Sequence, residues 1–181
     1  VLLGTSALVC LALAAPVMAD DFVITSSDGS TNGNIAPDDI DGSDTVSLGI
    51  ALVTTGTNKG IVTTNVDNVD DGNTITISDT GSITTTGDAA YGIFNEGNGN
   101  ETTVSGTGSI KTTGDSAVGI IYSGDENKTT VSGSITTGDV DENTGNHAFG
   151  IMNVGYENTT TVSDTGSIKT TGGFAIGILN L

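Results

Sequence analysis

The chain contains no arginine and no tryptophan, and among its 181 residues it has one histidine, one cysteine and two prolines. Its four lysines are opposed by 22 aspartates and glutamates, so the formal net charge is −18 at pH 7. A chain this acidic repels phosphate backbones and anionic lipids, so neither nucleic acid nor an anionic membrane surface is an expected partner. The single cysteine, Cys10, lies near the start. No disulfide can therefore stabilise the remainder, whose stability must come from packing.

The first nineteen residues carry no charge and end in Val17-Met18-Ala19, directly before Asp20. This pattern is typical of the apolar region and cleavage site of a secretory signal peptide, here without its Met and basic start. The alternative of a membrane anchor is disfavoured, because the apolar stretch is short and no stop-transfer pattern follows. Lipidation at Cys10 is disfavoured by the bulky Val9 before it. We expect an exported protein with a signal peptide over residues 1–19.

Residues 20–43 differ in composition from the rest of the mature chain, because they combine six aspartates with Pro37 and several Gly and Asn. We expect an acidic cap over the end of the fold, with a disordered lead-in as the alternative. Residues 44–181 form the repeats described next, and we expect them to be incomplete at the carboxy-terminal end.

A repeated phrase dominates residues 44–181. Each unit has a β-branched anchor, a Gly-Ser-Ile type step, a Thr-Thr-Gly run and a Gly-Ile step, with anchors at Val46, Ile77, Val104, Val131 and Val162. The units contain short runs of alternating β-branched residues, which are typical of strands, and no window has the spacing of an amphipathic helix. A unit this small buries its apolar face only by stacking on its copies. The sequence therefore predicts an all-β, right-handed parallel β-helix of about five coils with three short strands each.

An asparagine stands four residues before the anchor in four units, at Asn73, Asn100, Asn127 and Asn158. Asparagine amides can hydrogen-bond along a stack, which predicts an internal structural ladder. The alternative interpretation treats the segments that begin at Asn100, Asn127 and Asn158 as glycosylation sequons. The ladder is favoured, because Asn73 keeps the position without being a sequon.

The leader, the acidic cysteine-free chain and repeats such as Gly108 to Ile120 resemble the β-helical passenger regions of Gram-negative autotransporters. The resemblance covers most of residues 44–181. It indicates the fold and the secretion route better than the activity. It implies an amino-terminal passenger fragment displayed at the cell surface or secreted. It also implies attachment to the outer membrane only through a carboxy-terminal barrel in the full protein.

The sequence offers little for catalysis, and we expect neither an enzyme nor a cofactor. A triad at His147 would need a neighbouring Asp and an exposed Ser, and no nucleophile elbow lies near it. The acid pairs Asp38-Asp39 and Asp70-Asp71 permit a glycosidase interpretation, but they fall outside the regular coils. A polysaccharide-active enzyme of this fold would need basic residues near a sugar acid, and the chain has few.

A calcium site is the one metal candidate, and no other metal is expected. Asp139, Asp141 and Asn143 place oxygen ligands at alternate positions of an inserted loop. The match then fails, because Thr144 stands at the glycine position and Gly150 where a closing glutamate belongs. Plain acidic loops are the favoured interpretation.

Two outer surfaces are candidates for recognition. Thr runs recur at one side of the coil, as in β-helical ice-binding proteins, but Lys111 and Lys169 interrupt the array. In the Gly-Ile strand both faces are apolar. We expect the row of Tyr91, Ile93 and their equivalents to be core, and we expect an outward contact stripe of Phe94, Ile121, Met152 and Leu179.

These observations predict a non-enzymatic, surface-exposed adhesin or stalk, with host surface or matrix ligands or a second copy as partners. A structural surface-layer or spacer protein is the alternative. An ice-binding protein and a polysaccharide-active enzyme are disfavoured.

Overall fold

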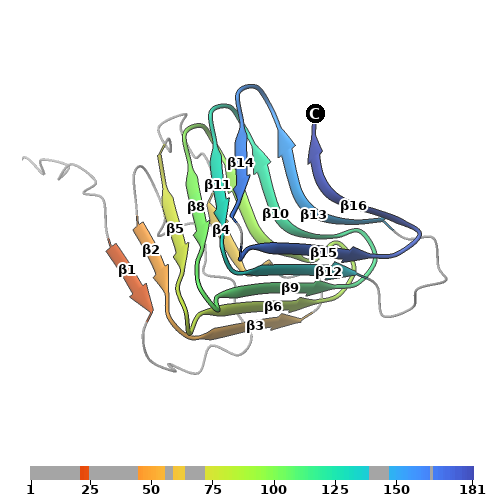
Figure 1. Cartoon of the computed structure of the whole chain (residues 1–181), viewed down its shortest axis with the longest axis horizontal. Coiled ribbons are helices and arrows are strands. Elements are labelled where there is room, and N and C mark those ends of the chain that lie inside the picture. Colours follow the sequence, from red (N-terminus) through yellow and green to blue (C-terminus); the bar gives the residue numbers. More distant parts are fainter. Residues whose placement is uncertain (1–20, 25–44, 56–58, 64–71, 139–146, 164) are drawn as a thin grey trace, which may run out of the picture.

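The computed structural model describes residues 21–24, 45–55, 59–63, 72–138, 147–163 and 165–181, and the regular elements in these ranges are all strands. They form three parallel sheets around one axis (Figure 1). The first sheet contains, in spatial order, β1 (Asp21–Ile24), β2 (Thr45–Leu48), β5 (Thr74–Ile77), β8 (Glu101–Val104), β11 (Lys128–Val131) and β14 (Thr159–Val162). The second contains β3 (Ala51–Thr55), β6 (Ser82–Thr86), β9 (Ser109–Thr113), β12 (Ser134–Gly138) and β15 (Ser167–Thr171). The third contains β4 (Ile61–Thr63), β7 (Tyr91–Glu96), β10 (Ala117–Ser123), β13 (His147–Val154) and β16 (Phe174–Asn180).

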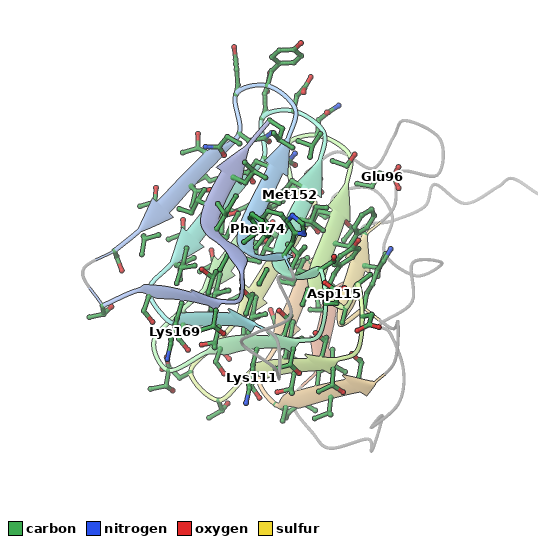
Figure 2. The ribbon with its side chains drawn as sticks, turned by 90° about the vertical axis from the view of Figure 1, so that its right-hand side faces the viewer. Glu96, Lys111, Asp115, Met152, Lys169 and Phe174 are labelled. Carbon is green, nitrogen blue, oxygen red and sulfur yellow. The ribbon has the colours of Figure 1, made fainter. Side chains whose placement is uncertain are left out.

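The predicted all-β parallel β-helix with three strands per coil is confirmed. The chain passes through the first, second and third sheets in turn and then returns to the first, one strand further along the axis. The solenoid has about four turns, slightly fewer than the five coils expected. Each set of three strands around the axis is called a level below. Figures 1 and 2 together show that the coils are right-handed. Every neighbouring pair of strands is parallel, so equivalent residues of successive coils lie one above the other.

The register of the first coil differs from the sequence alignment. Leu48, and not Val46, pairs with Ile77, while Val46 pairs with Ile75. In the second sheet Leu52 pairs with Ile83 as expected. The turn between the first and second strands of this coil is therefore two residues shorter than in the next coil, and the strand itself is conserved in length. The alignment on one β-branched residue missed this because β5 offers two isoleucines at alternate positions.

The segment expected to form a cap contributes a strand. Residues 21–24 form β1, which pairs with β2 in parallel and places Phe22 beside Val46 and Ile24 beside Leu48. The other residues of the expected signal peptide and cap lie outside the described residues. Among the described residues, the first sheet thus has one strand more at this end than the second and third sheets.

The core is a set of apolar columns that run along the axis. Isoleucine, leucine and valine side chains of all three sheets point inward and form a single cluster. Ile83, Ile110 and Ile135 form one such column in the second sheet and are almost fully buried. Similar side chains stack from level to level because the parallel register repeats the same inward position.

The four asparagines of the expected ladder lie directly one above the other, each immediately before a strand of the first sheet. The Oδ1 atom of Asn100 accepts a hydrogen bond from the backbone N–H of Asn73 at 3.1 Å. The Oδ1 atom of Asn127 accepts from the backbone N–H of Asn100 at 2.8 Å and from its Nδ2 at 3.0 Å. The Oδ1 atom of Asn158 accepts a hydrogen bond from the backbone N–H of Asn127 at 2.9 Å. Asn100 and Asn127 are each only 1% exposed, so their amides are inaccessible for glycosylation in the folded protein.

A second polar column lies inside the third sheet and contains Thr63, Asn95, Tyr122, Asn153 and Asn180. Thr63 donates to Asn95 at 2.9 Å, and Asn153 donates to Asn180 at 2.7 Å. Tyr122 occupies the asparagine position of its coil, is fully buried, and donates its hydroxyl to the backbone carbonyl of Lys128 at 3.2 Å. Burial raises the pKa of Tyr122 from 10.0 to about 12, because the interior disfavours the phenolate.

Replacement of Asn100 by Ala should destabilise the fold by about 2 kcal/mol, because the buried N–H of Asn73 loses its acceptor and Asn127 loses a donor. The free energy of unfolding from denaturant titration measures this. Ser123→Ala, at an exposed position of the third sheet, is the control and should change stability by less than about 0.5 kcal/mol. Equal stabilities of the two variants would contradict the structural role of the ladder.

Tyr122 should make stability fall in strongly alkaline solution. Its pKa is raised in the folded state, so its contribution is complete below pH 10 and is lost as the pH rises toward 12. The loss should amount to roughly 2 to 3 kcal/mol. Unfolding titrations across this range should show that Tyr122→Phe removes the loss, whereas Tyr156→Phe, at a side chain 80% exposed, retains it. An unchanged alkaline slope in Tyr122→Phe would contradict the assignment.

Candidate functional site

The long strands of the third sheet bend sharply at the glycine of the Gly-Ile step. At Gly119 an added methyl group would lie 2.6 Å from the Ile135 side chain, so this position faces the core. The next residue, Ile120, is fully buried in the same core. Two successive inward residues break the alternation of a flat strand, and the strand turns there. Figure 1 shows the result in β10, β13 and β16, which run back along the second sheet and then bend alongside the first.

The corner requires glycine because successive coils approach each other closely. An added methyl group at Gly119 would lie 2.5 Å from the carbonyl oxygen of Gly150. The same distance is 2.5 Å from Gly92 to Gly119 and 2.4 Å from Gly150 to Gly177. Gly60 repeats the contact with Gly92 at 2.4 Å, which identifies Gly60-Ile61 as the Gly-Ile step of the first coil. No other residue fits at these contacts without moving backbone.

The bend brings the outward side chains of the two arms of the third sheet together as an apolar strip that runs along the axis, which we call the groove. Val118 and Ile121 fill its floor and are buried, and its other members are half-buried or exposed. We define the groove by these residues: Tyr91, Phe94, Val118, Ile121, Phe149, Met152, Ile176 and Leu179. Figure 2 looks onto this side of the molecule, with Met152 and Phe174 on it and with Glu96 and Asp115 toward the amino-terminal coils.

The expected contact stripe of Phe94, Ile121, Met152 and Leu179 forms one wall of this groove. Phe94, Met152 and Leu179 are half-buried, and Ile121 is buried between Phe94 and Met152 in the register. The expected core row is right for Ile93, Ile120 and Ile151, which lie in the core cluster. Val118 is also buried, but it lies outside that cluster on the opposite wall of the groove, with the half-buried Tyr91 and Phe149. The prediction was wrong for Ile176 and Ile178, which are exposed. A flat strand would have placed both sets on one face, and the glycine corner separates them.

Aromatic rings meet across the groove at its amino-terminal end. The rings of Tyr91 and Phe94 are stacked, with centroids 6.0 Å apart and planes inclined by 17°. The ammonium nitrogen of Lys59, from the segment before β4, lies 3.9 Å from the centre of the Phe94 ring and 5.5 Å from that of Tyr91. This is cation–π geometry, in which the positive charge lies over the negative face of each ring.

The single histidine belongs to a second aromatic cluster further along the axis. The ring of His147 stacks on Phe149 at 6.2 Å and on Phe174 at 5.1 Å. Phe174 is 62% exposed, so this cluster is accessible from solvent. The recorded contacts of His147 are thus with aromatic rings. They indicate a surface role in the groove and give no support for the catalytic triad considered from the sequence.

Acidic turns border the groove on both sides. The turn before the third sheet presents Asp88 and Asp115, which stack through a hydrogen bond from the Asp115 N–H to the Asp88 carboxylate at 3.3 Å. The opposite border presents Glu96, Asp125, Glu126 and Glu157. The Asp125 carboxylate accepts a hydrogen bond from the backbone N–H of Tyr156 at 2.8 Å. The groove is therefore an apolar channel between two acidic borders.

The threonine array expected for ice binding is only partly on the surface. Thr85, Thr112 and Thr137 point inward and are fully buried. The outward row of the second sheet reads Val53, Thr84, Lys111, Thr136 and Lys169 along the axis. This alternation of hydroxyl and ammonium groups is not a regular hydroxyl face, and it gives no support for ice binding.

The remaining predicted sites fall outside the described residues. These are the calcium candidates Asp139, Asp141 and Asn143 and the acid pairs Asp38-Asp39 and Asp70-Asp71. Within the part of the chain that the structure describes, no group of three or more His, Cys, Asp or Glu side chains could hold a metal ion. The same part contains no helix long and apolar enough to cross a membrane.

Comparison with known proteins gave no match: no family model, no curated protein and no solved structure resembles the chain closely enough to be reported. The groove must therefore be interpreted from its own residues.

Sequence reasoning missed one wall of the groove and its lysine. The signal for the wall was present in the repeated glycine, because an interior strand glycine often marks a bend. On that interpretation, the glycine of each strand, such as Gly92 or Gly119, divides the strand into two arms. The inward and outward positions alternate in one arm and are shifted by one residue in the other. Lys59 had no such signal, since it lies more than thirty residues before the rings that it covers.

The corner makes a sharp prediction with a matched control in the same column. Gly119→Ala should destabilise the protein by about 3 kcal/mol, because its methyl group meets backbone and the Ile135 side chain. Gly177→Ala has nothing within 4 Å of the added methyl group and should cost less than about 0.5 kcal/mol. Thermal or denaturant unfolding measures both. Equal costs would show that the corner does not depend on the close approach of coils.

Proposed function

We propose that this chain is a non-enzymatic, surface-exposed β-helical passenger of an autotransporter-like protein, in which it serves as an adhesin. The observation that carries the proposal is the apolar groove, which continues across four levels of the solenoid on an outer face of the rod. Solvent-exposed apolar surface that extends over several repeats is typical of a protein interaction site. Solenoids commonly bind partners along such extended concave surfaces.

The interior supports a scaffold role. The inward positions of the described coils are filled by isoleucine, valine, threonine and asparagine columns that repeat from level to level. Bonds along the axis join buried amides of successive levels, as between Asn100 and Asn127, although the Nδ2 of Asn127 itself has no partner. Among the described residues, the exposed large apolar side chains Phe174 and Ile176 lie at the groove, and others such as Val53 and Val162 lie on the other two sheets.

The proposed export route rests on the sequence. Residues 1–19 have the pattern of a secretory signal peptide, and a mature chain without cysteine crosses a periplasm without forming disulfides. The parallel solenoid agrees with the passenger resemblance at the level of the fold. Display at the surface of a Gram-negative cell is the location that suits these features.

A spacer or surface-layer protein is the second candidate. It is favoured by the continuous bonding along the axis, in which each level is joined to the next by backbone ladders and by the asparagine column. Such bonding stiffens a rod without any partner. The two candidates differ in whether the groove is used.

Display on a non-adherent Gram-negative cell tests the proposal. Cells that carry the chain on a surface anchor should attach to host cells, to matrix-coated surfaces or to one another, and cells with the anchor alone should not. Replacement of Phe94, Ile121 and Met152 by Ser should abolish most of this attachment, since it removes one wall of the groove.

The matched control replaces Thr84 and Thr136 by Ala on the outward face of the second sheet, and it should leave attachment unchanged. Surface level and thermal unfolding are measured for every variant, because Ile121 is buried and its loss can affect folding. No attachment to any surface would favour the spacer. Attachment that survives loss of the wall would place adhesion elsewhere on the rod.

A further inference from the structure

The groove has the length and shape of a site for an extended chain. Equivalent residues of neighbouring coils lie about 4.8 Å apart, so the four levels from Tyr91 to Ile176 span about 14 Å. An extended polypeptide advances about 3.3 Å per residue, and about four to five residues would cover this distance. A compact ligand would contact only one or two levels.

The charges around the groove favour a partner chain of one net charge. Both borders are acidic, with Asp88 and Asp115 on one side and Glu96, Asp125 and Glu157 on the other. Three of the four lysines lie on other faces. Lys111 and Lys169 belong to the second sheet, and Lys128 pairs with Glu101 in the first at 2.9 Å. A second copy of this acidic chain would be repelled, whereas a basic segment would be attracted.

Lys59 shows how a cationic side chain is seated in the groove. Its ammonium group lies over Phe94 at 3.9 Å and near Tyr91 at 5.5 Å, while the chain net charge of −18 surrounds it. The cluster of His147, Phe149 and Phe174 offers further aromatic faces toward the carboxy-terminal coils. Phe174 is 62% exposed, so its ring is accessible to a cation from a partner.

We propose that the groove binds an extended, basic segment of a partner polypeptide. Apolar side chains of the segment lie against Ile121, Met152 and their neighbours, and a lysine or arginine lies over the ring of Phe149 or Phe174. The acidic borders attract the remaining positive charges of the segment. This inference rests on the proposed adhesin role, to which it adds the chemical class of the partner.

The test uses the full chain and a short fluorescent peptide in which lysine and valine alternate. Fluorescence anisotropy at about 0.15 M salt should show saturable binding, whereas the peptide with glutamate for lysine should not bind. Met152→Ser and Phe174→Ser should each weaken the affinity about tenfold. Val53→Ser, an outward apolar truncation on the second sheet, should leave it unchanged.

Lysine variants separate seating in the groove from bulk charge. Lys59→Ala uncovers Tyr91 and Phe94 and should tighten binding of the lysine–valine peptide about threefold to tenfold. Lys111→Ala removes the same charge from the second sheet and should have no comparable effect. Equal gains in the two variants would reduce the attraction to net charge and overturn the proposal.

Three further results would overturn it: no binding of the lysine–valine peptide, equal binding of the glutamate peptide, or binding unaffected by the groove variants. Preferential binding of a neutral oligosaccharide would assign the aromatic faces to sugar stacking and would also overturn it. These results are distinguishable from failure of the adhesin role. Displayed cells that still attach through the groove, without peptide binding, would retain the adhesin and reject only this partner class.

Discussion

The shape of the outer surface depends on one contact, the close approach of glycine to the carbonyl oxygen of the coil above. At Gly92, Gly119 and Gly150 any side chain would collide with backbone within 2.5 Å. Because each strand of the third sheet bends at that contact, the coil has two arms, and the outer side chains on them converge. The groove is thus a consequence of packing inside the corner. A sheet with alanine in this column would have to separate its coils or straighten, and either change would remove the concave face.

Parallel stacking imposes a second constraint, since whatever one coil places inward must be tolerated by its neighbours. Polar residues are better tolerated when they repeat, because an amide can then bond with the amide one level away, as Asn100 does with Asn127. The buried Nδ2 of Asn127 has no such partner. Tyr122 shows the limit of this rule. It replaces an asparagine between Asn95 and Asn153, and its hydroxyl bonds instead with the backbone carbonyl of Lys128. The column tolerates one larger member when that member carries its own donor to an acceptor nearby.

The extent of prediction from sequence follows from these two constraints. Repeat spacing and β-branched runs were sufficient for the fold class, the three strands per coil and the column of asparagines, because each depends on local pattern and on register. The direction of side chains around Gly119 could not be obtained from alternation, which assumes a flat strand. The pairing of Leu48 with Ile77 was also missed, since it depends on the length of a turn and not on the strand. Lys59 is a contact between distant segments, for which a single sequence carries no signal.

The distribution of lysines gives the groove a chemical character that its apolar lining alone would not have. An apolar channel in water can bind almost any complementary apolar surface. Discrimination between partners therefore requires charged groups. Here Lys111, Lys169 and Lys128 lie on the first and second sheets, while the borders of the third sheet carry carboxylates. The lysine that does lie in the channel, Lys59, has its charge over aromatic rings. If the groove binds the proposed basic segment, these carboxylates supply the discrimination between basic and acidic partners that the apolar lining alone does not.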